Sequence, residues 1–148
     1  AAAATLAVLL MTGFGCAHGS AAPAATAVQT ISIEYTNVHV LVAPDGRITL
    51  VDSGFPRNVE KLEVALRRKG LAPKNVAAVI VTHGHADHAG GASHFQKKYG
   101  AVVIAGKGDE AGLAAGHNDA LCPTDGIARR QHARHQSEVF AATQADLW

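Results

Sequence analysis

The sequence predicts an α/β fold, a layered sheet with helices packed on it. Three observations lead to this prediction. Residues 28–55 contain short runs rich in β-branched side chains that alternate in part between apolar and polar. From residue 57 the apolar positions recur at helical spacing instead. Two continuous apolar runs, 75–81 and 101–106, then have the length and composition of strands buried on both faces.

The first region is expected to form a β-meander. A turn at "PDG" (44–46) has a clear cause, because proline presets φ and the glycine accepts a positive φ. Short antiparallel strands at this spacing predict a sheet with one solvated face. The strand segments are "TISIEY" (30–35), "NVHVLVA" (37–43) and "RITLVD" (47–52).

A helix that ends near Gly70 is expected next, since its apolar and basic residues take opposite sides. A second helix over about 89–99, ending at Gly100, should separate the two buried strands. Beyond Gly106 we expect a loop-rich stretch with one short helix, followed by a weakly amphipathic, helix-prone segment over 127–148. The apolar positions of the first helix are Val59, Leu62, Ala65 and Leu66, opposite Arg57, Lys61, Arg67 and Arg68.

Composition limits the classes of partner. The chain has 148 residues, and with 48% hydrophobic residues it can form one domain with a core. A formal net charge of +1 and an aromatic content of 5% give no indication of a nucleic acid or a membrane surface as partner. We therefore expect a small-molecule substrate, and the sequence does not specify an oligomeric state.

Residues 1–27 are interpreted as a signal segment that is incomplete at its N-terminus, which leaves 28–148 as the domain. The apolar stretch at the start is shorter than the roughly 20 residues of a membrane span, and small residues follow it. Cleavage after Ala27 is one interpretation, and a lipid anchor on Cys16 is the alternative. Both predict a periplasmic or secreted protein. Cys122 is interpreted as a small apolar residue.

The stretch "THGHADHAGG", residues 82–91, places four potential metal ligands within six positions, directly after a predicted buried strand. These are His83, His85, Asp87 and His88. Residues two apart in extended backbone project to the same side, so the first two histidines can bind one ion together. Neutral imidazoles with a carboxylate favour zinc, with iron or manganese less exclusively. A solvated histidine-rich turn is the alternative, and the density of ligands disfavours it.

This stretch resembles the His-x-His-x-Asp-His signature of the metallo-β-lactamase superfamily. "LVDSG" (50–54) resembles the strand that precedes it there, and the resemblance covers about 30–106. It implies the αββα sandwich of that superfamily, of which this chain would be the N-terminal half, with a metal site at one edge.

Carried over to this sequence, the resemblance assigns His83 and His85 to a first ion, and Asp87 and His88 to a second. Asp87 would also be catalytic, because it helps to orient the bridging hydroxide. Asp52 would be a hydrogen-bonded structural residue near the site. The complete protein would then hold two zinc ions.

The implied activity is hydrolysis of an ester, thioester, amide or lactam, or phosphoester by a metal-bound hydroxide. A single-iron enzyme similar to persulfide dioxygenases is an alternative. The di-iron flavoprotein variant is disfavoured, because His85 occupies the position of its glutamate.

The resemblance also implies later ligands, a histidine, an aspartate and a final histidine, and no segment similar to Gly-His-Thr-Pro-Gly is found. We therefore expect a truncated metallo-hydrolase, and the rival hypothesis is a non-catalytic, metal-binding fragment. His132 and His135 are three apart and could share a helical face, but their surroundings favour a solvated helix. The downstream candidates are His117, His132, His135, Asp109, Asp119 and Asp125.

Overall fold

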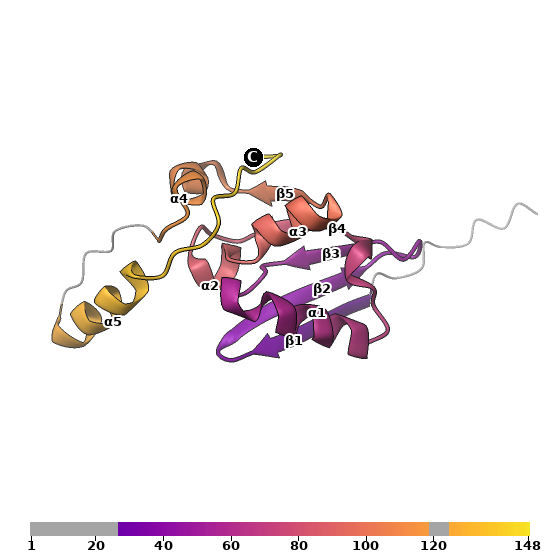
Figure 1. Cartoon of the computed structure of the whole chain (residues 1–148), viewed down its shortest axis with the longest axis horizontal. Coiled ribbons are helices and arrows are strands. Elements are labelled where there is room, and N and C mark those ends of the chain that lie inside the picture. Colours follow the sequence, from indigo (N-terminus) through magenta and orange to yellow (C-terminus); the bar gives the residue numbers. More distant parts are fainter. Residues whose placement is uncertain (1–26, 119–124) are drawn as a thin grey trace, which may run out of the picture.

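A five-stranded mixed sheet forms the centre of the protein, whose computed structural model describes residues 27–118 and 125–148. Its strands are neighbours in sequence order (Figure 1). The first three are antiparallel, and the last three are parallel. The strands are β1 (Ala27–Ile33), β2 (Thr36–Val42), β3 (Ile48–Val51), β4 (Val76–Val81) and β5 (Val102–Ala105).

Helices α1 and α3 lie on the same face of this sheet, and α2 lies near the ends of the strands (Figure 1). Helix α1 ends close to the predicted residue, and Gly70 has the positive φ (+75°) typical of a helix terminus. The helices are α1 (Val59–Arg68), α2 (Ala86–Ala89), α3 (Ala92–Tyr99), α4 (Glu110–Ala115) and α5 (Gly126–Gln136), with single-turn 3-10 helices at Pro56–Asn58, Pro73–Asn75 and Lys107–Asp109.

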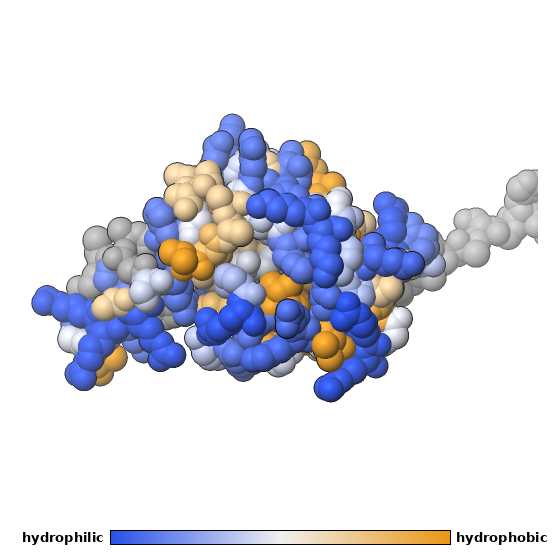
Figure 2. All heavy atoms as spheres, viewed as in Figure 1, coloured by the Kyte–Doolittle hydropathy of each residue, from blue (hydrophilic) through white to orange (hydrophobic). Residues whose placement is uncertain are grey.

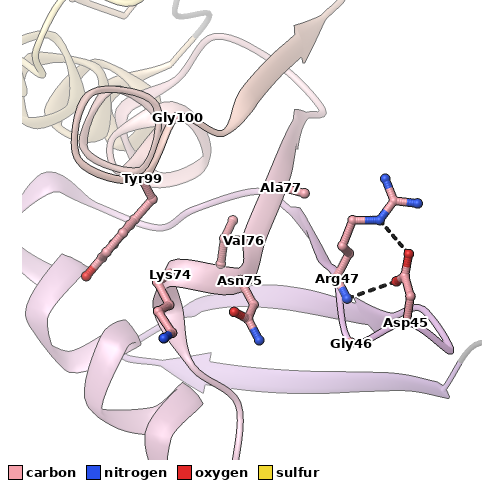
Figure 3. A pocket seen from close by; sticks show the side chains of 9 residues that line it. All are labelled: Asp45, Gly46, Arg47, Lys74, Asn75, Val76, Ala77, Tyr99 and Gly100. Atoms are coloured by element: carbon pink, nitrogen blue, oxygen red, sulfur yellow. Dashed lines mark hydrogen bonds and ion pairs between the residues drawn. The ribbon is translucent and has the colours of Figure 1, made fainter.

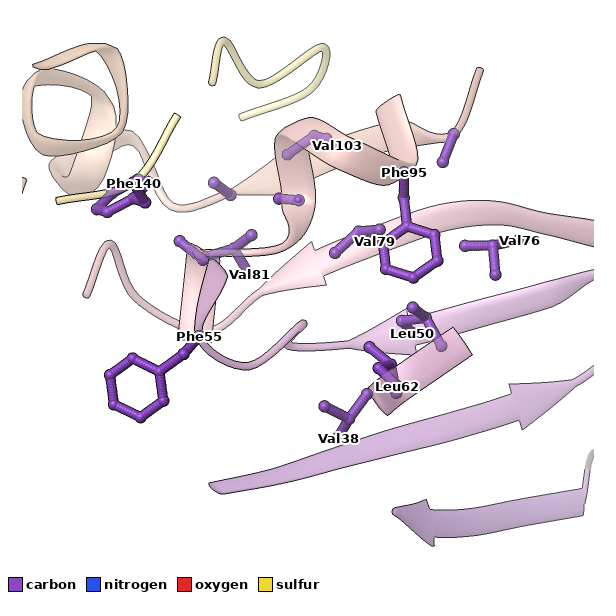
Figure 4. Packing of buried hydrophobic residues seen from close by; sticks show 14 of the residues in the cluster. Val38, Leu50, Phe55, Leu62, Val76, Val79, Val81, Phe95, Val103 and Phe140 are labelled. Carbon is purple, nitrogen blue, oxygen red and sulfur yellow. The ribbon is translucent and has the colours of Figure 1, made fainter. Parts of the chain in front are cut away.

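The core lies between the sheet and these two helices. Figure 4 shows Phe95 of α3 directed at β4, near Val76 and Val79, and Leu62 of α1 next to Leu50 of β3. All five side chains are almost completely buried. Burying an aliphatic or aromatic side chain of this size contributes about 1.5–3 kcal/mol each, so these contacts hold the helices on the sheet.

The second predicted helix is divided in two, which corrects the continuous helix expected over 89–99. Helix α2 ends at Ala89 and α3 begins at Ala92. The residues between them are Gly90 and Gly91, and a Cβ on Gly91 would lie 2.7 Å from the carbonyl oxygen of Ser53. The two glycines therefore let the break pack directly against the loop that follows β3.

Strand β4 is fully buried on one face and half-buried on the other, whereas the continuous apolar run predicted full burial on both. Its buried residues are Val76, Val79 and Val81, and the others are half-buried. The spacing from 76 to 79 breaks the alternation because the pairing with β3 shifts there: Ile48 pairs with Val76, but Thr49 pairs with Ala78. The extra residue on β4 lets Val76 and Val79 both be buried although they are three positions apart.

Helix α5 confirms the helix-prone assignment over 127–136, but the segment after α5 is extended, which corrects the assignment over 137–148. Residues 137–148 pass the end of α4 and reach β5 at Asp146 and Leu147, with a parallel bridge between Ile104 and Leu147. The N–H of Asp146 donates to the carbonyl oxygen of Val103 (2.8 Å). Local sequence could not predict this, because the partners are about 40 residues away.

The surface over α1, α3 and α5 is mainly hydrophilic, with scattered hydrophobic residues (Figure 2). Among the described residues, no helix combines the length and apolar character that crossing a membrane requires. Residues 1–26 of the predicted signal segment, with Cys16, and Cys122 lie outside the described residues, so their assignments stay predictions. Ala27, the last residue of that segment, begins β1.

Candidate metal centre

The histidine-rich loop lies where parallel strands end. Strand β4 ends at Val81, and Asp52 directly follows the neighbouring strand β3. Because the carboxyl ends of parallel strands meet at one edge of the sheet, Asp52 and the loop at 82–88 are adjacent. Open α/β sheets bind ligands at this edge, which is where the sequence predicted the site.

The structure brings three of the four predicted ligands together. Ligand atoms of His83, His85 and Asp87 all lie within 4.8 Å of one another, and the three residues are half-buried. The backbone enters α2 at Ala86, and this turn brings Asp87 back toward the two histidines. Two imidazoles and one carboxylate are a donor set that suits zinc, so these residues fit a metal ion.

His88 lies beside this group but is held by carboxylates. Its ring centroid is 4.0 Å from that of His83. Its Nδ1 donates to Oδ2 of Asp52 (2.8 Å), and its Nε2 is 3.3 Å from Oδ2 of Asp87. The hydrogen bond to Asp52, with the contact to Asp87, raises the pKa of His88 to about 9. A metal ion bound to His88 would displace one proton of the protonated ring, because an imidazole nitrogen that ligates a metal carries no proton.

Asp52 accepts three kinds of hydrogen bond in an uncommon backbone conformation. Its φ is +65°, which non-glycine residues seldom adopt. Its carboxylate accepts from the backbone N–H and the hydroxyl of Thr82 (2.9 Å each) and from His88. Burial raises the pKa of Asp52, but the bonds from His88 and Thr82 outweigh that effect and lower it overall. The residue is therefore a charged acceptor that orients the loop.

His83 and Asp87 have pKa shifts that favour metal binding. Burial lowers the pKa of His83, and the neighbouring His88 and His85 rings lower it further. His83 is therefore neutral over a wider pH range, and neutral imidazole is the form that binds metals. The hydrogen bond from His88 lowers the pKa of Asp87, which favours its carboxylate form.

Ser53 fixes α2 to the end of β3, a role that the sequence did not indicate. Its N–H and its hydroxyl both donate to the carbonyl oxygen of His88, at 2.7 and 2.9 Å. The N–H of Gly91 donates to the same hydroxyl (3.0 Å). The position of Ser53 within "LVDSG" was the available signal, since it follows Asp52 directly.

None of the described downstream candidates joins the group formed by His83, His85 and Asp87. His117 is exposed, and its Nδ1 lies 3.0 Å from the carbonyl oxygen of Asn118. Asp125 accepts from backbone N–H groups at the start of α5. Asp109 accepts from the loop itself, and His132 is half-buried on α5. Asp119 and the side chain of His135 lie outside the described part of the chain.

A hollow of about 420 Å³ lies at the opposite end of the sheet (Figure 3). Arg47 and Lys74 give it basic character, but Asp45 bonds the Arg47 guanidinium at 2.7 Å. It contains no histidine or cysteine, and Asp45 is its one carboxylate. The hollow therefore does not compete with the loop as a metal site.

Sequence comparison agrees with this geometry. The family model described as "Metallo-beta-lactamase superfamily" matches residues 33–119. The chain belongs to the metallo-beta-lactamase superfamily. The match includes β2 to α4 and the whole histidine-rich loop.

Two curated relatives match about half of this chain. A hydroxyacylglutathione hydrolase from Xanthomonas axonopodis is 38% identical over 73 residues, which are 49% of this chain and 26% of the relative. A probable metallo-hydrolase from Bacillus subtilis is 36% identical over 69 residues, which are 46% of this chain and 30% of the relative. The chain thus matches between about a quarter and a third of each relative's length.

Solved metallo-beta-lactamase structures share the fold. The enzyme with a HARLDQ motif from Cronobacter sakazakii superposes with a TM-score of 0.66 at 21% identity, over 81% of this chain and 43% of that one. The subclass B3 enzyme BJP-1 from Bradyrhizobium japonicum gives 0.60 at 23% identity, over 75% and 38%. The α/β architecture described above therefore corresponds to part of the metallo-beta-lactamase fold.

Proposed function

We propose that this chain supplies metal ligands of a metal-dependent hydrolase. The observation that carries the proposal is the convergence of His83, His85 and Asp87, whose ligand atoms lie within 4.8 Å of one another. Membership of the superfamily supports it, and so do the names of the curated relatives, a hydroxyacylglutathione hydrolase and a probable metallo-hydrolase.

A divalent ion held there supplies Lewis acidity and a water of lowered pKa. The residues of the chain have separate roles around it. His83 and His85 would bind the ion through neutral imidazoles, and Asp87 would offer a carboxylate both as ligand and as acceptor that orients a water molecule. The Asp52 carboxylate holds Nδ1 of His88, which leaves Nε2 as the nitrogen that can bind a second ion.

The substrate class follows from this chemistry only in outline. Esters, thioesters, amides or lactams, and phosphoesters all develop negative charge on oxygen during hydrolysis, and a cation stabilises that charge. We propose zinc as the metal and two ions in the complete protein, because imidazole and carboxylate donors suit zinc. Iron would support the alternative, an enzyme similar to persulfide dioxygenases.

The metal content of untagged protein tests the proposal. We expect zinc to bind wild-type protein, and His83→Ala and Asp87→Ala to weaken its affinity more than about tenfold, since each removes a ligand. His39→Ala is the matched control, because His39 is an exposed imidazole on β2 that contacts Thr30. Elemental analysis and a competing chromogenic chelator measure both quantities. Wild-type protein without bound metal, or equal affinities in all variants, would contradict the proposal.

The non-catalytic alternative is distinguished by turnover. The protein encoded by the complete reading frame of the gene should be assayed with a p-nitrophenyl ester, an S-acyl thiol, a β-lactam and a phosphodiester. The hydrolase hypothesis is supported if wild-type protein hydrolyses one of these substrates and a folded Asp87→Ala variant does not. Bound zinc without hydrolysis of any of the four bonds favours a metal-binding module instead.

A further inference from the structure

Two side chains from beyond β5 hold the backbone of the histidine-rich loop. Oδ1 of Asp109 accepts the N–H of Gly84 at 2.8 Å. Oδ1 of Asn118 accepts the N–H of Ala86 at 2.7 Å. These N–H groups belong to residues that alternate with the three clustered side chains, so the loop is bound at every second residue. Both acceptors are distant in sequence, by 25 and 32 residues.

The Asp109 side chain accepts a hydrogen bond from the histidine-rich loop and none from its own helix, α4. It occupies the N-cap position of α4, where an aspartate ordinarily accepts an N–H of the first helical turn. No side-chain capping bond is present there. The carboxylate bonds Gly84 instead, so α4 lacks a side-chain cap while the loop gains an acceptor.

Gly84 is needed for this contact because of space. Its φ does not lie in the left-handed region, so backbone freedom does not explain a glycine there. A Cβ at this position would lie 3.2 Å from Oδ1 and 3.3 Å from Cβ of Asp109. The residue between the two clustered histidines is therefore small so that Asp109 can approach the backbone.

Asn118 caps the helix that carries Asp87. Ala86 is the first residue of α2, and its N–H has no partner within that helix. His85 is the N-cap residue but makes no side-chain capping bond. The buried Asn118 side chain, 6% exposed, provides the acceptor. The His85 imidazole is thereby not required as a cap and is available to a metal.

We propose that Asp109 and Asn118 are positioning residues that hold the loop in the conformation that binds metal. The proposal rests on the proposed function, since it assigns them to the same site. A loop already fixed at Gly84 and Ala86 loses little conformational freedom when His83, His85 and Asp87 bind an ion. Neither residue touches the ion, and both act through backbone N–H groups.

The test uses zinc and the whole chain. We compare wild type with Asp109→Ala, Asn118→Ala and Asp109→Asn, which retains an acceptor oxygen. Asp125→Ala is the matched control, because Asp125 accepts backbone N–H groups at α5. Zinc affinity is measured by chelator competition, and amide hydrogen exchange at residues 84 and 86 by NMR. Thermal melts report whether each variant folds.

We expect zinc affinity to fall about tenfold or more in both alanine variants and to change less than about threefold in Asp109→Asn and the control. Exchange should quicken at Gly84 in Asp109→Ala and at Ala86 in Asn118→Ala, even without metal. Unchanged exchange would overturn the proposal, as would faster exchange with unaltered zinc affinity. If Asp109→Ala does not fold, Gly84→Ala gives a second route, since the added Cβ crowds the Asp109 carboxylate. Faster exchange at residue 84 then shows that the bond is weakened, and unaltered zinc affinity in that variant would overturn the proposal.

Failure of the proposed function gives a different pattern. Wild-type protein that binds no zinc contradicts the metal site itself. Amide exchange at residues 84 and 86 still decides, in the absence of metal, whether these side chains hold the loop.

Discussion

Asp52 shows how one residue combines backbone strain with a functional contact. Its positive φ is unfavourable for a residue with a Cβ by roughly 1–2 kcal/mol, yet glycine does not occupy the position. The carboxylate accounts for this, because it accepts bonds from Thr82 and from His88 while the side chain is only 7% exposed. The resemblance predicted a hydrogen-bonded Asp52, but the strained φ could not be deduced from the sequence because it depends on contacts with the loop 30 residues later.

Two substitutions at Asp52 separate the strain from the hydrogen bonds. Both Asp52→Gly and Asp52→Ala leave the Thr82 N–H and the His88 ring without this acceptor, which should reduce the free energy of unfolding by about 1–3 kcal/mol. Asp52→Ala keeps the strained φ, so we expect it to be about 1 kcal/mol less stable than Asp52→Gly. Urea denaturation of metal-free protein measures both differences. An alanine variant as stable as wild type would show that the hydrogen bonds contribute nothing, because Asp52→Ala keeps the strained φ and loses only the bonds.

At the scale of elements, Glu63 joins the two helices that cover the sheet. This carboxylate of α1 accepts from three groups of α3: Tyr99 Oη (2.7 Å), His94 Nε2 (2.8 Å) and Lys98 Nζ (3.0 Å). Arg67 of α1 is a fourth donor. Helix α3 follows α2 after Gly90 and Gly91, so this cluster anchors the helix next to the one that carries Asp87. The helical pattern predicted α1 from its apolar residues, but it gave no sign that Glu63 lies on the buried side.

Glu63→Gln should reduce the free energy of unfolding at pH 7 by about 1–3 kcal/mol, because the amide is a weaker acceptor than a carboxylate with cationic donors. The Tyr99, His94 and other bonds lower the pKa of Glu63 well below its usual value, although burial raises it. The folded state then binds a proton less readily than the unfolded one. Wild-type stability should therefore fall as the pH drops below about 4.5.

The glutamine variant should lose part of that pH dependence, since it has no carboxylate to protonate at this position. Glu60→Gln is the matched control, an exposed glutamate on the same helix. Chemical denaturation at pH 7, 4.5 and 3.5 provides the comparison. Equal pH dependence in wild type and Glu63→Gln would show that the cluster does not stabilise the charged form.

For the whole molecule, local patterns predicted the strands and the first helix well because their own side chains decide them. The four candidate ligand residues were also evident, since they lie within six positions of the sequence. Contacts between distant segments were not predictable: the extra residue in β4, Asp109 at the loop, and the extended segment 137–148. That segment is tied to both Gly116 and Leu113, through the N–H groups of Phe140 and Thr143. It therefore links β5 to the part of the chain that holds the loop.

Phe140 tests whether this segment belongs to the fold. Its side chain is 7% exposed, whereas its neighbour Val139 is 71% exposed. Phe140→Ala should lower the free energy of unfolding by about 3 kcal/mol, because truncating a buried aromatic residue leaves a cavity. Val139→Ala should change it by less than about 0.5 kcal/mol. Denaturation curves of the two variants, with equal m-values, measure the difference. Similar small effects at both positions would mean that the Phe140 side chain does not pack into the core.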